Sequence, residues 1–394
     1  MTTRDRVRLG RPIGLGPGPP GQGVWDRSRP LIWADADRAP LFEVERDHLE
    51  LLSRSGALAR LPSGGVGSEA GSDSRAVDVA HALGVDLLHA GSLGWGPVSD
   101  SARASLTYLD EALAEPGRRF RPGRGSDGTW LPDPDDADAD AQDVHGQVVL
   151  ALGEVCARGA DREFCSAAAA LFRRAMPGTR GLTHLRAIAT AILGCEAAGR
   201  GGLDDAARSL RTLVPLLAAR FEPVAWSLDW PWPEPLVTAE SALSARALII
   251  GGRRIADRRM VEIGLAVLDW LVRSAVAPRG HLSPVGDDGW WTRHGVRAAF
   301  DQLPIEALSI LVASEAAFRA TGNRRHLADM ERAYGWFLGA NDLGVEVADP
   351  DRGGCRDGLG PDGARLRQGA ASTLAWLTAL EHIRTGRGRW AATT

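Results

Sequence analysis

The stretch LPIEALSILVASEAAFRATGNRRHLADMERAYGWFLG, residues 303–339, carries the pattern that decides the fold. Its apolar residues recur at spacings of three and four, which is the period of an amphipathic α-helix. The segment Thr321-Gly322-Asn323 interrupts this pattern and leaves room only for a tight reversal of the chain. The stretch therefore predicts two antiparallel helices, near 303–320 and 324–339.

The same helical pattern extends over most of the chain. Alanine and leucine are abundant, and the alternating runs of β-branched residues that indicate strands are nearly missing. The sequence is therefore predicted to be all-α. Ten further helices are predicted near 44–59, 74–89, 101–115, 142–158, 161–175, 182–199, 203–219, 236–251, 257–274 and 369–384. Residues 1–40, rich in Gly, Pro and Arg, are predicted to form an irregular N-terminal arm.

The predicted connections alternate in length. If the twelve predicted helices are numbered in chain order, the connections before odd-numbered helices are mostly short. Those before even-numbered helices are mostly long, as at 116–141, 275–302 and 340–368. In antiparallel hairpins, such alternation places all the long loops at one end of the molecule. We therefore expect residues 41–390 to form a single (α/α)6 toroid, in which the even helices form the inner ring and begin at the loop-rich end. Two smaller helical domains are the alternative, although no Pro/Gly/Ser-rich linker divides the chain.

Composition argues against several kinds of function. The 394 residues carry a net charge of −4, all the basic side chains except histidine are arginine, and no stretch is strongly basic. This distribution is not typical of a nucleic-acid-binding protein. The glycine-rich runs follow no predicted strand, and the four cysteines lack the spacing of a disulfide framework or metal site, so we predict neither a metal nor a cofactor. Without a signal sequence or an apolar run of 18 residues, the chain is predicted to be cytoplasmic, with no membrane insertion.

The long loops and the starts of the even-numbered helices gather carboxylates, amides and tryptophans. Indole rings can stack on the apolar faces of sugars, and hydrolysis of a glycoside needs a carboxylic acid together with a second carboxylate. We therefore expect an oligosaccharide or polysaccharide as ligand. The candidate acid/base pair is Asp301 and Glu234, with Asp143 and Asp357 as alternates. The candidate sugar-binding residues are Asp73, His145, Trp230, Trp232, Glu240, Trp290, Trp291, Gln302, Arg356 and Gln368.

Each of these residues also has a structural interpretation. Asp73, Asp143 and Asp301 stand where the N-caps of helices would lie. A tryptophan in a loop often anchors that loop to the core. The prediction of a site rests on the set, because several polar clusters fall at the same end of the expected ring.

Several motifs, in their order and spacing, resemble one family. They include WPWPEPLVTAESAL at 230–243, HLSPVGDDGWW at 281–291, FDQLPIEAL at 300–308, GGCRDGL at 353–359 and QGAASTLAWL at 368–377. These segments resemble the bacterial six-hairpin glycosidase-like domain associated with glycosyltransferases of polysaccharide loci. The resemblance is best over 220–385. It implies an (α/α)6 toroid, a role in carbohydrate metabolism and a possible glycosyltransferase partner.

Two other functions remain open beside a glycoside hydrolase. Gln142, Ala239 and Ala371 stand where that family carries other polar residues, so the chain could be a catalytically reduced sugar-binding or scaffolding partner of a glycosyltransferase. Ion pairs between arginine and the candidate acids Asp301 and Glu234 would favour that role. An isomerase or epimerase would need a pair of histidines facing the cavity, for which His145, His281 and His294 are the candidates.

Overall fold

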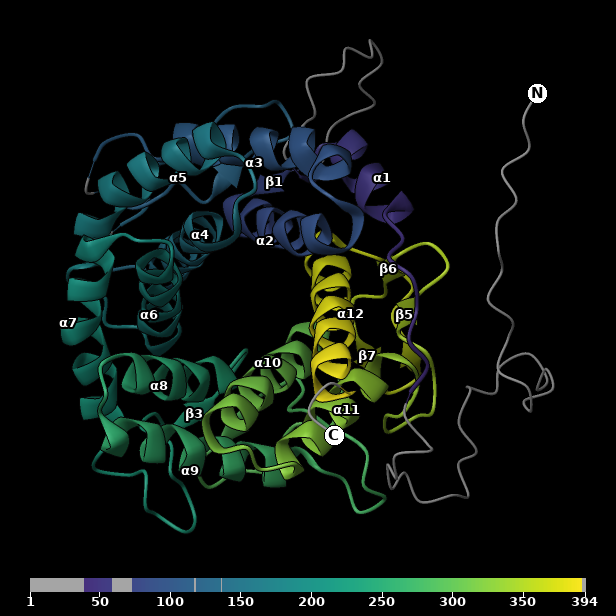
Figure 1. Ribbon diagram of the computed structural model, residues 1–394. Coiled ribbons are helices and arrows are strands. Elements are labelled where there is room, and N and C mark those ends of the chain that lie inside the picture. The colour runs from purple at the N-terminus through teal and green to yellow at the C-terminus, as the bar shows by residue number, and fades with distance from the viewer. Residues whose placement is uncertain (1–38, 59–72, 117, 136, 392–394) are drawn as a thin grey trace, which may run out of the picture.

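The computed structural model describes residues 39–58, 73–116, 118–135 and 137–391, with side chains up to residue 388. Over these residues twelve α-helices follow one another in a ring (Figure 1), and none is long and apolar enough to cross a membrane. Each observed helix overlaps a predicted one. The helices are α1 (Asp47–Ser55), α2 (Ala76–Leu93), α3 (Ser99–Ala112), α4 (Ala139–Arg158), α5 (Arg162–Ala175), α6 (Leu185–Arg200), α7 (Asp204–Phe221), α8 (Ala242–Arg254), α9 (Arg258–Ala275), α10 (Pro304–Thr321), α11 (Arg325–Phe337) and α12 (Ala370–Ala391).

The even-numbered helices form the inner ring and the odd-numbered helices surround them (Figure 1). Contacts run from α2 through α4, α6, α8 and α10 to α12, and α12 returns to contact α2. This closed double ring is an (α/α)6 toroid, so the predicted fold is confirmed. The predicted arm lies outside the described residues except for Ala39 and Pro40, and its boundary near residue 40 stays a prediction.

The two ends of the ring differ as the loop lengths predict. The connections 159–161, 201–203, 255–257 and 322–324 are short and form what we call the plain end. The opposite, loop-rich end carries a 3-10 turn at Met176–Thr179 and four antiparallel two-stranded pairs, whereas the 3-10 turn at Gly96–Val98 joins α2 to α3 at the plain end. These pairs are β1 (Ser74–Arg75) with β2 (Gly123–Arg124), β3 (Leu236–Val237) with β4 (Trp291–Thr292), β5 (Ala348–Asp349) with β6 (Gly354–Cys355), and β7 (Leu359–Gly360) with β8 (Gly363–Ala364).

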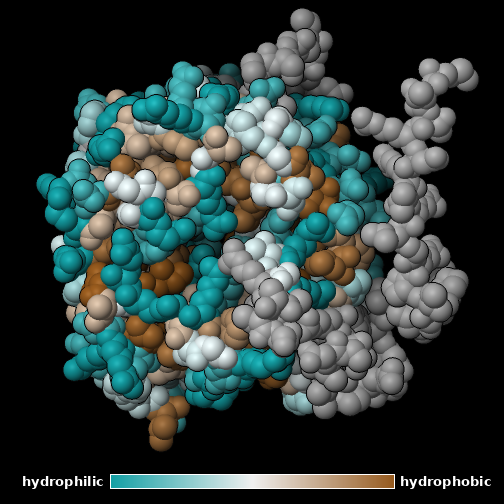
Figure 2. Space-filling model, in the orientation of Figure 1, coloured by the Kyte–Doolittle hydropathy of each residue, from teal (hydrophilic) through white to brown (hydrophobic). Residues whose placement is uncertain are grey.

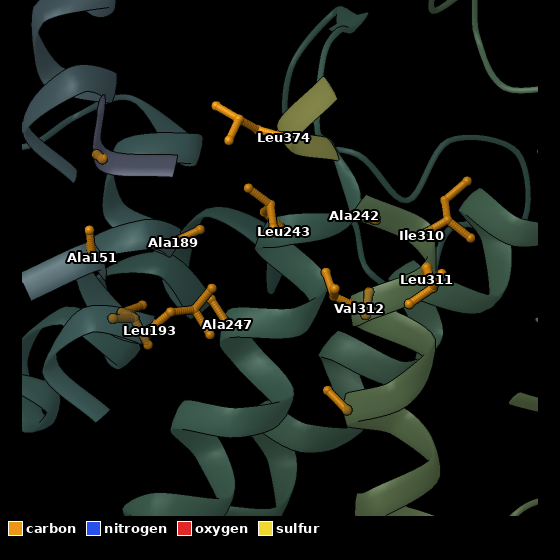
Figure 3. Packing of buried hydrophobic residues seen from close by; sticks show 14 of the residues in the cluster. Ala151, Ala189, Leu193, Ala242, Leu243, Ala247, Ile310, Leu311, Val312 and Leu374 are labelled. Carbon is orange, nitrogen blue, oxygen red and sulfur yellow. The ribbon is translucent and has the colours of Figure 1, made fainter. Parts of the chain in front are cut away.

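The hydrophobic core fills the space between neighbouring helices of the ring. Small and medium side chains such as Ala151, Leu193, Ala247 and Leu311 pack there (Figure 3), and all four are buried. Close packing of this kind disfavours even small changes in side-chain volume. The core therefore fixes how near the inner helices approach each other.

Glycines bring α4 and α6 into backbone contact. A Cβ atom at Gly194 would lie 2.5 Å from the carbonyl oxygen of Val149, and one at Gly153 would collide with the carbonyl of Gly194. At Gly146, nearer the loop-rich end, a Cβ would collide with the hydroxyl of Thr190. The absence of side chains at these three positions lets the two helices approach more closely than any other residue would permit.

We expect Gly153→Ala to destabilise the protein by about 1–3 kcal/mol, because the added methyl group forces two helix backbones apart. Thermal or denaturant unfolding measures this loss. The matched control is Gly199→Ala on α6, where the new Cβ would meet Ala207 at an ordinary 3.5 Å. The stability of that variant should rise by up to about 1 kcal/mol, because alanine has a higher helix propensity than glycine. Equal stability of the two variants would contradict the proposed close contact.

Candidate functional site

A cavity of about 130 Å³ lies on the axis of the ring. Its middle is lined by aliphatic side chains of the inner helices, among them Leu150, Leu243 and Leu374. His81, Gln147 and Glu240 line it toward the loop-rich end. Toward the plain end, the lining residues are Glu154, Arg158, Arg246 and His382. The two ends of one cavity therefore present different chemistry.

Asp143 organises the polar groups at the loop-rich end. Its carboxylate accepts a hydrogen bond from Nδ1 of His184 at 2.6 Å and another from Nε of Arg186 at 2.8 Å. The hydrogen bond that His184 donates to Asp143 raises the pKa of His184 above its ordinary value. Arg186 also lies 3.7 Å from the carboxylate of Glu240. Asp143 on α4 is thereby tied to α6 and, through Arg186, to the residues before α8.

Glu240 and Glu306 form a buried carboxyl pair beside Arg186. The backbone N–H of Glu240, a residue with a positive φ of 58°, donates a hydrogen bond of 2.6 Å to the Glu306 side chain. Burial raises the pKa of Glu240, although the positive charge of Arg186 opposes the rise. Burial raises the pKa of Glu306 to about 8. Glu306 is therefore mostly protonated at neutral pH.

His81 on α2 faces the same cavity as Glu240. Burial lowers the pKa of His81, and the negative charge of Glu240 and a hydrogen bond with Gln147 only partly oppose this effect. At neutral pH the imidazole is therefore uncharged and able to accept a proton. A neutral base and a carboxyl group with a raised pKa thus line one end of the axial cavity.

Three of the residues predicted for the site come together here: Asp143, Glu234 and Glu240. Glu234 is half-buried, burial raises its pKa, and the nearby charge of His184 opposes that rise. The sequence did not single out His81, His184, Arg186 or Glu306. The one sequence feature that could have indicated these residues is their position on, or just before, a predicted inner helix.

A second group of predicted residues lies around the starts of α10 and α12. Asp301 forms an ion pair with Arg365. Gln302 is buried, and its side chain accepts a hydrogen bond of 2.8 Å from Nε1 of Trp336. Asp357 accepts one of 2.7 Å from the N–H of Gly369, just before α12. Gln302 and Asp357 thus hold loop segments in place.

The tryptophans predicted to stack on sugar are largely packed against the protein. Trp230 is 3% exposed and Trp232 is 4% exposed. Their indole N–H groups donate to the carbonyls of Glu234 and Leu236, at 2.9 and 3.0 Å. Trp291 stacks on Trp270, with 5.0 Å between ring centroids. In this structure neither Trp230 nor Trp232 is open to a ligand, so we assign both to packing.

The other predicted residues lie away from the lining of the axial cavity. His145 is fully buried against Phe120, and burial lowers its pKa to about 3. Asp73 is exposed, whereas Trp290, Arg356 and Gln368 are partly exposed in the loops of the loop-rich end.

The histidines considered for an isomerase also lie elsewhere. His281 is buried and pairs with Asp342 at 2.8 Å, and His294 is exposed. His81 and His382 line the axial cavity instead, one near each end.

Comparison with solved structures places the fold among sugar-acting enzymes. The cellobiose 2-epimerase of Spirochaeta thermophila is similar, with a TM-score of 0.59 and 14% identity over 81% of this chain and 88% of that one. A D-mannose isomerase has a TM-score of 0.59 and 11% identity, with 86% and 97% covered. The GH76 α-mannanase of Bacteroides thetaiotaomicron has a TM-score of 0.53 and 12% identity, with 80% and 87% covered.

These similarities show that the chain shares the (α/α)6 toroid of those enzymes. At 11–14% identity they show the fold alone. Comparisons with models of protein families and with curated protein sequences find no match.

The raised pKa of Glu306 predicts a pH-dependent stability. A carboxyl with a pKa near 8 in the folded protein and 4.5 when unfolded holds its proton better in the folded state. The contribution of protonated Glu306 to the free energy of unfolding is therefore fully present below pH 4.5 and is lost as the pH rises through 8. Glu306→Gln cannot ionise, yet it retains an oxygen acceptor for the Glu240 N–H. As the pH is raised from about 5 to 9, we expect the free energy of unfolding of the variant to rise by up to a few kcal/mol relative to that of the wild type.

Melting temperatures of both proteins across that pH range test this expectation. The exposed Glu163→Gln on α5 is the control, and its difference from the wild type should change little with pH. A Glu306→Gln difference that is also constant would show that Glu306 does not carry the predicted proton.

Proposed function

We propose that this protein binds a saccharide at the loop-rich end of the axial cavity and transfers a proton on it. His81 is the proposed base and Glu240 the proposed acid. The observation that carries the proposal is that these two groups face one cavity while burial shifts both pKa values toward the uncharged forms. A neutral base beside a carboxyl group with a raised pKa is an arrangement that general acid–base catalysis uses.

Several features support a saccharide as the ligand. Gln147 and Glu240 line the cavity and can exchange hydrogen bonds with hydroxyl groups, and Arg186 lies beside Glu240. The solved structures with this fold include a cellobiose 2-epimerase and a D-mannose isomerase.

The arrangement favours isomerisation or epimerisation over hydrolysis. Hydrolysis needs two carboxyl groups facing the substrate. Of the carboxyl groups gathered here, Asp143 is held by His184 and Arg186, and Glu306 accepts a backbone N–H. Within the described residues, Glu240 is the carboxyl that lines this end of the cavity. In an isomerase, a neutral His81 would remove the proton next to a sugar carbonyl while Glu240 donates one to the carbonyl oxygen.

A sugar-binding role without catalysis is the second candidate. The ion pair of Asp301 with Arg365 and that of Asp143 with Arg186 neutralise two of the carboxylates predicted to act as acid or base. Glu234 has no such ion pair among the described residues. Of the predicted acid/base pair Asp301 and Glu234, only Asp301 is therefore neutralised by an arginine. A glycosyltransferase partner would belong to this second candidate and rests on the resemblance of the motifs.

Incubation with reducing sugars and oligosaccharides in D₂O separates these functions. If proton transfer occurs, NMR should show deuterium entering at the carbon next to the carbonyl and a new isomer appearing, with glycosidic bonds intact. Release of new reducing ends would identify a hydrolase instead. Binding without either change would favour the second candidate.

We expect Glu240→Gln and His81→Asn each to lower the rate of exchange by about 10²–10⁴-fold, because each removes one proton-transfer group. The matched controls are Glu163→Gln and His294→Asn, which alter exposed residues that do not line the cavity. The rate is measured under saturating sugar, and unfolding curves confirm that all four variants are folded. Exchange at the wild-type rate in both cavity variants would reject this assignment of roles.

A further inference from the structure

A second cavity, of about 400 Å³, lies at the plain end of the ring. It shares Glu154, Arg158 and Arg246 with the axial cavity, so the two spaces adjoin. Figure 2 shows a hollow at the centre of the ring, bordered mostly by hydrophilic residues. Six arginines line the plain-end cavity: Arg158, Arg200, Arg246, Arg253, Arg254 and Arg319.

Carboxylates neutralise only half of these arginines. Glu154 pairs with Arg158 at 2.5 Å, and Glu196 pairs with Arg200 at 3.0 Å. Glu315 pairs with Arg319 and also accepts a hydrogen bond of 2.7 Å from His382. These three glutamates are the acidic residues of the lining.

The other three arginines have no carboxylate partner in the described part of the chain. Arg253 donates to the backbone carbonyl of Arg319 at 2.6 Å, and Arg254 is exposed. Arg246 makes no hydrogen bond or ion pair with the described residues, and its Nε atom is buried. The cavity therefore carries a surplus of positive charge, with an unpartnered guanidinium at its inner end.

The C-terminal ends of the inner helices do not account for Arg246. Basic residues in the last turn of a helix offset its negative end, and Arg253 and Arg254 stand there on α8. Arg246 lies instead in the first half of α8 (Ala242–Arg254), where the helix dipole offers it no stabilisation. Arg246 is partly buried, and its buried Nε–H group has no acceptor, which is unfavourable unless an anion binds to it.

We propose that the plain-end cavity binds a phosphate group, either as the free ion or as a phosphomonoester, with Arg246 as its principal ligand. The negative charges of Glu154 and Glu315 act on Arg246 without contacting it, and the positive charges of Arg158 and Arg319 act on it as well. The two neighbouring arginines can therefore contribute further N–H donors. Guanidinium groups bind phosphate oxygens through paired hydrogen bonds. A doubly charged phosphate also matches the surplus of three positive charges better than a single carboxylate would.

This site is separate from the proposed proton-transfer site. Arg246 follows Glu240 by six positions, a separation of about 9 Å along a helix axis. Binding of phosphate here does not require the proposed isomerase activity. Glu240→Gln should therefore leave phosphate binding unchanged, which distinguishes failure of one proposal from failure of the other.

Melting temperature measured against increasing phosphate, at constant ionic strength set with NaCl, tests the proposal. Inorganic phosphate and a hexose 6-phosphate are the two probes, and the neutral hexose is the control ligand. We expect at least one of the two phosphates to stabilise the wild type in a saturable way. Saturable stabilisation by inorganic phosphate would identify the free ion as sufficient, and stabilisation by the ester alone would identify a phosphorylated metabolite.

Arg246→Gln should weaken the apparent affinity by at least about tenfold, because it removes a charge-assisted hydrogen-bond donor. It should also raise the melting temperature without phosphate, because the unpartnered cation is gone. Arg246→Lys keeps the charge but not the paired donors, so its affinity should be intermediate. Arg211→Gln, exposed on α7, is the matched control and should behave as the wild type.

Two results would overturn the proposal. One is the absence of saturable stabilisation by either phosphate at millimolar concentration. The other is an unchanged affinity in both Arg246 variants, which would place any bound phosphate elsewhere on the protein.

Discussion

The close approach of α4 and α6 is the constraint on which the rest of this structure depends. Gly146, Gly153 and Gly194 remove the side chains that would hold the two helix backbones apart. Because the inner ring is closed, the spacing of one pair of helices affects the width of the axial cavity. The same approach brings Asp143 on α4 within hydrogen-bond distance of His184 and Arg186. Helix packing and the geometry of the candidate site therefore have one physical origin.

The axial cavity separates two sets of ionisable groups by an aliphatic middle. At the loop-rich end, burial shifts His81 and Glu240 toward their uncharged forms, which suits proton transfer. At the plain end, arginines outnumber carboxylates, and Arg246 makes no ion pair or hydrogen bond with the described residues. One ring can thus keep two chemically different sites apart.

The fold was largely predictable because its signals are local. Helical periodicity and the length of each connection can be read from a few adjacent residues, as at Thr321-Gly322-Asn323. The site was predictable only in part. Asp143 and Glu240 stand near the starts of even-numbered helices, where the ring brings them together. His81 lies inside a helix, where its position resembles that of a core residue, and only closure of the ring turns it toward the cavity. The sequence could not show that Trp230 and Trp232 fold back onto Trp270 and Phe221.

The closure of the ring by α12 against α2 affects how the chain folds during its synthesis. Ser92 and Glu381 share a hydrogen bond of 2.9 Å across 289 positions, and Arg384 donates one to the carbonyl of Phe42. Contacts between residues so distant in sequence form late, since their loop-closure entropy must be overcome first. During synthesis, α2 therefore leaves the ribosome long before the helix that covers its open side. Until α12 emerges, the apolar edge of α2 is available to other chains, and the nascent protein has an interval in which chaperones would protect it from aggregation.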